Sequence, residues 1–489
     1  MATLRNNFLY NIAYQILQVL LPLITAPYIS RTLGADALGI YTYTNSVAYY
    51  FMLTAMLGIA NYGNRSISAI RGDRMAVNKT FSGIFSLQAI NFTAALIGYV
   101  VYLNLFTREN YLISTLQAIY LLSGLLDISW LYFGLEKFKT TVTRSVVVKL
   151  VTVVLIFLLV RRPTDLWKYT LIMVLGNFLG QLYLWRNLKR YASFTLVSIR
   201  DVFSHLKPAL LLFVPVLAYS IYKVMDKIML GNMCDYAQVG FYTNAEKIVN
   251  IPMGVITALG SVMLPRLSNQ IANGKERQVK QYINLSMKFV TIFSSAVGFG
   301  LMGVSDIFTE VFFGDGYEAC APLIRIMSAS VFFISWASVV RTQYLIPNHC
   351  ENIYLISTTT GAVVNLMLNI CLIPGLQARG AAIGSIMAEV SVFLVQLVAV
   401  RKELPVIDWI TEYIPAVVLG IVMSVGVSML GKVLAPGVFT LLLQICGGGV
   451  FFCVTLLVWL KYRNDMLWNQ LISVLPRFWN HKTENKQTS

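Results

Sequence analysis

Charged side chains inside two apolar stretches near the middle of the chain are its clearest candidates for chemistry. Residues 208–230 and 239–264 are each long enough to cross a bilayer. The first stretch contains Lys223, Asp226 and Lys227. Because these three residues are spaced i, i+3 and i+4, a helix would present them on one face, where they could bind or neutralise ions.

The second stretch contains Glu246 and Lys247, which lie about as far from the connecting turn as Asp226 and Lys227 do. A charged side chain that faces lipid at the bilayer centre costs about 2.5–3.5 kcal/mol on insertion scales. For the five charges together the cost would exceed ~10 kcal/mol, so we expect them to face a protein interior or water. The chain is therefore predicted to enclose a polar cavity within a membrane.

The composition excludes a soluble protein. Of the 489 residues, 57% are hydrophobic and only 12% are charged, against the ~25% charged residues that are typical of soluble domains. The formal net charge of +16 indicates membrane orientation and contact with anionic lipid rather than nucleic-acid binding. The six cysteines are scattered and the three histidines lie far apart, so we expect no disulfide framework, no metal site and no cofactor.

The pattern of apolar segments predicts an all-α polytopic membrane protein of about 14 transmembrane helices. The candidate spans are 8–29, 38–61, 81–105, 111–134, 143–160, 167–187, 208–230, 239–264, 284–311, 321–346, 353–374, 380–400, 411–434 and 438–460. Lys and Arg are concentrated in the termini and in the connections after even-numbered spans, which predicts that both termini are cytoplasmic. The first span is too long for a typical signal peptide and is expected to remain in the protein. The basic tail is predicted to be an amphipathic helix on the inner leaflet, the alternative being a frayed tail.

An internal repeat is visible when the chain is compared with itself at an offset of 201 residues. Gly39, Tyr41, Thr42 and Arg65 fall on Gly240, Tyr242, Thr243 and Arg266. Since 201 residues hold six spans, both copies have the same membrane orientation, which predicts two parallel six-helix lobes related by an axis along the membrane normal. The predicted domains are an N-lobe (1–204), a C-lobe (205–404), helices 13 and 14 (405–462) and a cytoplasmic amphipathic tail (463–489).

Several blocks of the sequence resemble a known family. The residues Arg31-Thr-Leu-Gly-Ala-Asp-Ala-Leu-Gly-Ile-Tyr41 are similar to a signature early in bacterial polysaccharide flippases of the O-antigen type. These flippases are members of the multidrug/oligosaccharidyl-lipid/polysaccharide exporter superfamily. Later blocks match the family in order, at 127–138, 341–347, 365–369, 373–374 and 380–389. The resemblance covers most of residues 1–400.

The resemblance implies that the chain is a flippase rather than an enzyme. The expected substrate is an undecaprenyl-diphosphate-linked oligosaccharide, moved across the bacterial inner membrane for O-antigen and lipopolysaccharide, capsule or exopolysaccharide biosynthesis. The two lobes are expected to form a V and to work by alternating access without nucleotide hydrolysis, and the chain contains no GxxxxGK[ST] phosphate loop. A polysaccharide polymerase and a chain-length regulator are expected partners, together with the substrate and membrane lipids.

Such a substrate needs cations for its diphosphate and hydroxyl, amide and aromatic groups for its glycan. The diphosphate candidates are Lys223, Lys227, Lys247, Arg31, Arg325 and Arg341. The glycan candidates are Tyr41, Tyr43, Asn45, Tyr242 and Asn244, for which packing between helices or a place in the interfacial belt is the alternative.

Coupling to a proton or Na⁺ gradient needs a buried carboxylate that binds and releases the ion. Asp226, Glu246 and Glu389 are the candidates, and permanent pairing with a cation is the alternative for each. Asp127 and Lys149 are expected to pair with each other and to hold the first lobe together, and a role in transport or ion coupling is the alternative for this pair.

Two other functions compete with the flippase hypothesis. A cation-coupled multidrug or metabolite antiporter of the same superfamily would favour buried acids, whereas buried cations are at least as numerous here. A membrane glycan polymerase or glycosyltransferase would be expected to have a large outer loop or a catalytic acidic motif, and the outer connections are short.

Overall fold

The computed structural model of the protein is almost entirely helical. It describes the backbone of residues 2–107 and 109–463, and the side chains from residue 21 onward within these ranges. None of the described residues forms a β-strand. Apart from residue 463, the predicted amphipathic tail lies outside the described residues.

The helices follow one another with short connections. The first ten are α1 (Ala2–Met56), α2 (Ile59–Ile70), α3 (Arg74–Phe106), α4 (Tyr111–Leu125), α5 (Ser129–Gly134), α6 (Phe138–Leu159), α7 (Leu166–Arg186), α8 (Leu188–Tyr191), α9 (Ile199–Ser204) and α10 (Leu206–Met233). They are followed by α11 (Tyr236–Asn250), α12 (Met253–Ala272), α13 (Glu276–Phe313), α14 (Cys320–Ser328), α15 (Ser330–Val340), α16 (Glu351–Leu376), α17 (Ala378–Val400), α18 (Val406–Val433) and α19 (Val438–Tyr462). A short 3₁₀ helix (Pro163–Asp165) precedes α7, and a π-helix (Arg341–Leu345) follows α15.

These helices make the chain a multi-pass membrane protein. Within the described residues, ten helical segments are long and apolar enough to cross a membrane, and the pair α11–α12, bent by 46°, makes an eleventh. The other three predicted spans are helical as well: the first lies in α1, the second in α1 and the start of α2, and the sixth in α7. The break between the first two spans falls at Gly34, whose φ of 80° and ψ of 169° are open to glycine and not to residues with a Cβ.

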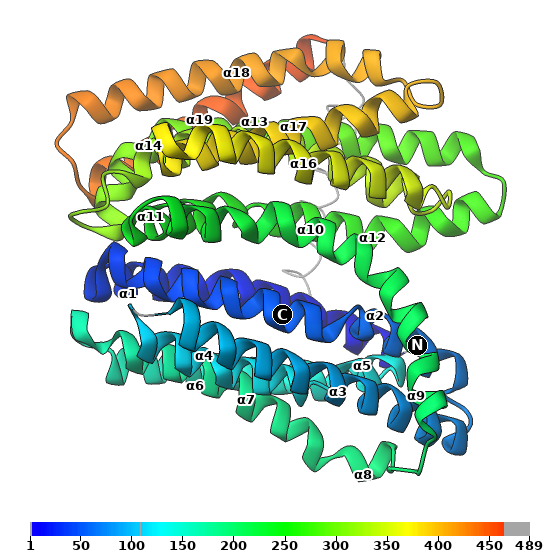
Figure 1. The fold of residues 1–489 in the computed structure, drawn as a ribbon. Coiled ribbons are helices and arrows are strands. Elements are labelled where there is room, and N and C mark those ends of the chain that lie inside the picture. The colour runs from blue at the N-terminus through cyan, green and yellow to red at the C-terminus, as the bar shows by residue number, and fades with distance from the viewer. Residues whose placement is uncertain (1, 108, 464–489) are drawn as a thin grey trace, which may run out of the picture.

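The chain is arranged in two halves that lie side by side (Figure 1). Helices α1 to α8, blue to green, occupy one half, and α10 to α17 occupy the other, with α18 and α19 at its far edge. Helix α1 packs directly against α10 and α11, so these three helices bring the halves together. The domain limits given above stay a prediction.

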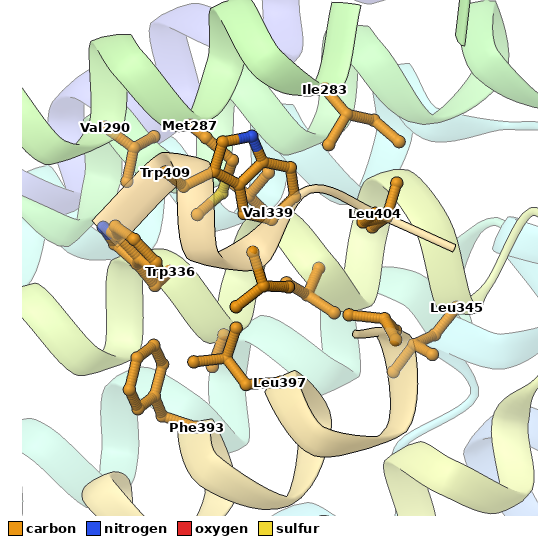
Figure 2. Packing of buried hydrophobic residues seen from close by; sticks show 14 of the residues in the cluster. Ile283, Met287, Val290, Trp336, Val339, Leu345, Phe393, Leu397, Leu404 and Trp409 are labelled. Carbon is orange, nitrogen blue, oxygen red and sulfur yellow. The ribbon is translucent and has the colours of Figure 1, made fainter. Parts of the chain in front are cut away.

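A large apolar core holds the second half together (Figure 2). Trp336 of α15 and Trp409 of α18 are each 1% exposed within it. Their indole N–H groups donate to Thr291 Oγ1 and Asn284 Oδ1 of α13, each at 2.8 Å. Because both polar atoms are satisfied, the rings add apolar burial without an unpaired donor, and they fix α13, α15 and α18 relative to one another.

The two halves meet at a pair of glycines that the sequence repeat relates to each other. A Cβ placed on Gly39 would lie 1.7 Å from the carbonyl oxygen of Tyr236, and a Cβ on Gly240 would lie 2.1 Å from that of Ala35. Ala35 and Tyr236 are themselves related by the offset of 201 residues. This contact, which we call the glycine crossing, is therefore two-fold symmetric, as a duplicated transporter fold predicts.

Candidate functional site

A cavity of ≈ 370 Å³ lies where α1, α6 and α7 of the first half face α11 of the second. Two cationic side chains line it, Lys149 from α6 and Lys247 from α11. No Asp or Glu of the described residues is among its lining groups. The neutral polar groups that line it are Thr25, Tyr41, Thr152, Tyr169, Asn177 and Asn244. Two ammonium groups among neutral donors and acceptors favour an anionic ligand with polar substituents.

A second hollow of ≈ 180 Å³ adjoins this cavity between α6 and α7. The two spaces share Lys149 and Asn177 as lining residues. Arg144 lines the second hollow, and its Nη1 donates to Gln181 Oε1 at 2.9 Å. Cations therefore follow one another from Lys247 through Lys149 to Arg144, along a path lined by side-chain amides.

Two of the five predicted glycan-contact residues line the cavity, Tyr41 and Asn244. The ring of Tyr41 packs edge-on against that of Tyr169, with 4.8 Å between centroids, which leaves an aromatic surface on the cavity wall. The other three lie in contacts between helices. Tyr43 donates to Asn232 Oδ1 at 2.6 Å across the two halves, and Asn45 donates to Gln117 Oε1 at 3.2 Å.

The second half contains two ion pairs that neutralise two of the predicted phosphate ligands. Lys223 Nζ of α10 lies 3.0 Å from Glu389 Oε1 of α17. Lys227 Nζ, one helical turn further on, lies 2.8 Å from Glu246 Oε2 of α11. A carboxylate so close to each ammonium competes with any phosphate for it. Lys247, in contrast, makes no salt bridge with any described residue and is exposed to the cavity.

Asp226 belongs to the same group of side chains, and its hydrogen-bond partners among the described residues are neutral. Asp226 is buried, with 2% of its surface exposed. The carboxylate accepts hydrogen bonds from Ser385 Oγ and Asn369 Nδ2, each at 2.6 Å, and from the hydroxyl of Tyr242. With Lys223 and Lys227 already paired, an ionised Asp226 gives this group of side chains a net charge of −1.

The three predicted arginine ligands lie away from the cavity. Arg31 donates to the backbone carbonyl of Val311, at the end of α13. Arg325 Nη2 is 2.6 Å from Asp306 Oδ2, and both side chains are about half exposed. The guanidinium carbon of Arg341 lies 5.4 Å above the ring centre of Tyr354.

Asp127 and Lys149 make contacts of different kinds. The Asp127 carboxylate accepts the backbone N–H of Ser129 at 2.9 Å, at the start of α5, while Lys149 lines the cavity.

Asn369 and Ser385 were not identified from the sequence as neighbours of Asp226. Asn369 could have been found from the sequence, because it forms an i, i+4 pair with Asn365 inside an apolar span. Buried amides of this kind need polar hydrogen-bond partners.

Comparisons with known proteins agree with this architecture. Residues 4–271, more than half of the chain, match the family described as Polysaccharide biosynthesis protein. The chain is 26% identical over 392 residues to the "Putative O-antigen transporter" of Shigella dysenteriae, covering 78% of this chain and 96% of that protein. A protein of the same name from Escherichia coli strain K12 is 23% identical over 406 residues, covering 82% and 97%.

Two solved structures show that the fold is that of known membrane transporters. The structure of the lipid II flippase MurJ in an inward closed conformation superimposes with a TM-score of 0.78 at 14% identity, covering 94% of this chain and all of that one. A multidrug resistance transporter of the MATE family in an inward-facing conformation gives a TM-score of 0.59 at 14% identity, covering 80% and 99%. The chain belongs to the polysaccharide biosynthesis protein family.

Proposed function

We propose that the protein is a flippase that moves an undecaprenyl-diphosphate-linked oligosaccharide across the bacterial inner membrane by alternating access. The observation that carries the proposal is the cavity between the halves, which has cations from both sides and no described carboxylate. The relatives named as O-antigen transporters and the MurJ-like fold support this substrate class. The surface polymer served by the transport is O-antigen, capsule or exopolysaccharide.

Different cavity residues bind different parts of the substrate, according to their chemistry. Lys149 and Lys247 bind the diphosphate from opposite walls, since ammonium–phosphate hydrogen bonds are about twice as strong as neutral ones. Tyr41 and Asn244 contact the first sugars by stacking and hydrogen bonding. Because the two lysines belong to different halves, a diphosphate held between them draws the halves together at this point.

Reconstitution in proteoliposomes with a fluorescent lipid-diphosphate oligosaccharide tests the proposal. A hydrogen bond to a charged group contributes about 1.5–3 kcal/mol, so we expect Lys149→Gln and Lys247→Gln each to slow transbilayer movement roughly 10-fold or more. Lys402→Gln, an exposed lysine between α17 and α18, is the control with the same charge change. Rates for both cavity variants equal to that of the control would reject the proposed site.

We further propose that Asp226 couples transport to a proton or Na⁺ gradient. A single monovalent cation at Asp226 would neutralise the net charge of −1 that remains after Lys223 and Lys227 are paired, which predicts one ion per transport event. In Asp226→Asn, transport should lose its dependence on the ion gradient. Asp306→Asn, the same change at an exposed acid, should keep that dependence. If Asp226→Asn keeps it as well, this carboxylate is not the coupling group.

The proposal includes an orientation and partners. Both termini are cytoplasmic, as the distribution of Lys and Arg favours, so reporter fusions at either end should be active on the cytoplasmic side only. A polysaccharide polymerase and a chain-length regulator consume the flipped repeat units at the other face.

A further inference from the structure

A basic hollow lies at one end of the first half, away from the transport cavity. Its volume is ≈ 400 Å³, and it forms where the α2–α3 and α5–α6 connections meet α8. Four cationic side chains line it, Arg71, Arg74, Lys137 and Arg190, around the ring of Tyr191. The hollow is more than ten times the ~30 Å³ that one water molecule occupies in the liquid, so it admits a phosphate group and its substituents.

Buried contacts fix the walls of this hollow. The hydroxyl of Tyr132, a fully buried residue, donates to the carbonyl of Leu184 at 2.6 Å, and its ring packs edge-on against Tyr191 with 5.5 Å between centroids. The backbone N–H of Lys137 donates to the carbonyl of Tyr132 at 2.8 Å. These contacts hold the α5–α6 turn and α8 at a fixed distance. Lys137 of the turn and Arg190 of α8 are therefore held at the same hollow.

Within the ranges that the structure describes, one of the four cations has a carboxylate partner. Arg71 pairs with Glu136. In the part of the chain that the structure describes, Arg74, Lys137 and Arg190 form no salt bridge. Lys137 and Arg190 instead lie about equally far from the Tyr191 ring centre, at 6.0 and 5.9 Å. Three positive charges thus face one open space without a salt-bridge partner among the described residues.

The hollow lies at the ends of helices that are long and apolar enough to cross a membrane. Two membrane-crossing helices begin beside it, α3 at Arg74 and α6 at Phe138. Two large apolar side chains next to the hollow are exposed, Met75 (81%) and Phe133 (38%), and would contact acyl chains. Basic pockets at the ends of transmembrane helices are recognised features of anionic-lipid binding.

We propose that this hollow is a second anion site, in which Arg74, Lys137 and Arg190 bind a phosphate group. Two sources share this chemistry: the headgroup of an anionic phospholipid in the surrounding leaflet, and free diphosphate in solution. The site does not depend on the flippase function, because it neither adjoins the transport cavity nor shares a lining residue with it.

Ligand binding to the purified full chain tests the proposal. Bound phosphatidylglycerol and phosphatidylcholine are counted by native mass spectrometry, and inorganic pyrophosphate is titrated by calorimetry. The triple variant Arg74→Gln/Lys137→Gln/Arg190→Gln should bind the anionic ligand roughly 100-fold more weakly. Lys275→Gln/Arg277→Gln/Lys280→Gln, at the exposed start of α13, removes the same charge elsewhere and should bind normally.

The outcomes separate the two sources from failure of the proposal. Loss of phosphatidylglycerol binding in the triple variant alone supports a lipid headgroup site, and loss of pyrophosphate binding alone supports a site for soluble phosphate. Equal binding by the triple variant and the wild type, or equal loss in the control, overturns the proposal. The charge-retaining variant Arg74→Lys/Arg190→Lys should keep its ligand; if it loses as much as the triple variant, charge is not what holds the phosphate.

Discussion

Replacing either glycine of the glycine crossing by alanine should force the two halves apart at this point. The added Cβ of Gly39→Ala would lie 1.7 Å from the Tyr236 carbonyl oxygen, and that of Gly240→Ala would lie 2.1 Å from the Ala35 carbonyl oxygen. Ordinary contact begins at 3.4 Å, and the opposing atoms belong to helix backbones that cannot rotate away. Each variant therefore requires the helices to separate by more than ~1 Å.

The cost of this separation sets the size of the effect. Overpacking in a well-packed contact costs about 1–3 kcal/mol, and here this cost destabilises only the state in which the glycine crossing is closed. At ~1.4 kcal/mol per factor of ten, a cost of ~2 kcal/mol shifts the ratio of closed to open molecules about 30-fold. Because one separation relieves both clashes, the double variant should cost less than the two single variants added together.

The distance between spin labels at the crossing measures this shift. Asp36 and Asp235 are exposed residues at the adjoining ends of the two halves, and labels attached there through unnatural amino acids avoid the native cysteines. In Gly39→Ala, in Gly240→Ala and in the double variant, the distribution should move to longer distances and transport should slow. Gly426→Ala is the control, since no atom lies within 4 Å of the added Cβ.

Two results would refute the reasoning. Unchanged distances in both single variants would mean that the halves do not make this backbone contact in the membrane. A double variant whose shift equals the sum of the two single shifts would mean that the two glycines act independently, against the symmetric geometry of the crossing.

Three further predictions concern stability and the Asp226 group. Asp165 accepts hydrogen bonds from Lys168 and from two backbone N–H groups, which lower its pKa to about 2. The ionised carboxylate therefore stabilises the fold above its ordinary pKa of 3.8, and this stabilisation is lost as the pH falls through 2. Asp165→Asn should accordingly lower the thermal midpoint at pH 6 but not below pH 2. Trp336→Ala should destabilise the second half by about 3–5 kcal/mol, measured by chemical unfolding in detergent, since it empties a buried indole site. Gly384→Ala would place a Cβ 2.2 Å from Asn369 Oδ1, so it should displace the Asn369 amide from Asp226 and weaken the ion dependence of transport, while Gly447→Ala should not.

The architecture was largely predictable because its main signals are local. Apolar runs of bilayer length place the helices, and counting from the turn predicts similar depths for the charges of the two middle spans. In the structure Lys227 pairs with Glu246 at 2.8 Å, a contact that similar depth alone does not specify. The repeat paired Gly39 with Gly240, yet it could not indicate that these residues touch. A repeat fixes symmetry, whereas contact depends on how closely two helix backbones approach.

The site was less predictable because it depends on which helix face turns inward. The partner of Lys223 is Glu389, 166 residues away on α17, and no spacing in the sequence connects them. Lys149 was expected to pair with Asp127 within its own lobe, with a role in transport as the alternative, and the structure places it on the wall of the cavity that also carries Lys247. Rotation of α6 about its axis decides between these roles, and that rotation is set by packing against α1 and α7 rather than by composition.

The two copies of the repeat have diverged in chemistry while keeping their geometry. When the copies are aligned at Leu33 and Leu230, which precede the turns, Asp226 falls on Ile29. Ile29 lines the transport cavity, whereas Asp226 is enclosed by neutral donors in the second half. The first copy thus supplies a neutral wall for substrate, and the second copy places a charge at the same position of the fold.

Helix α11 connects the Asp226 group with the transport cavity that Lys247 lines. Within its fifteen residues, Tyr242 bonds to Asp226, Lys247 lines the cavity, and Gly240 forms the glycine crossing. Neutralising Asp226 removes the charge that holds the Tyr242 hydroxyl, and a helix responds as one body because its own backbone hydrogen bonds keep it rigid. We expect any shift of α11 that follows to move Lys247 and the glycine crossing together, which would couple the proposed ion site, the proposed diphosphate site and closure of the halves.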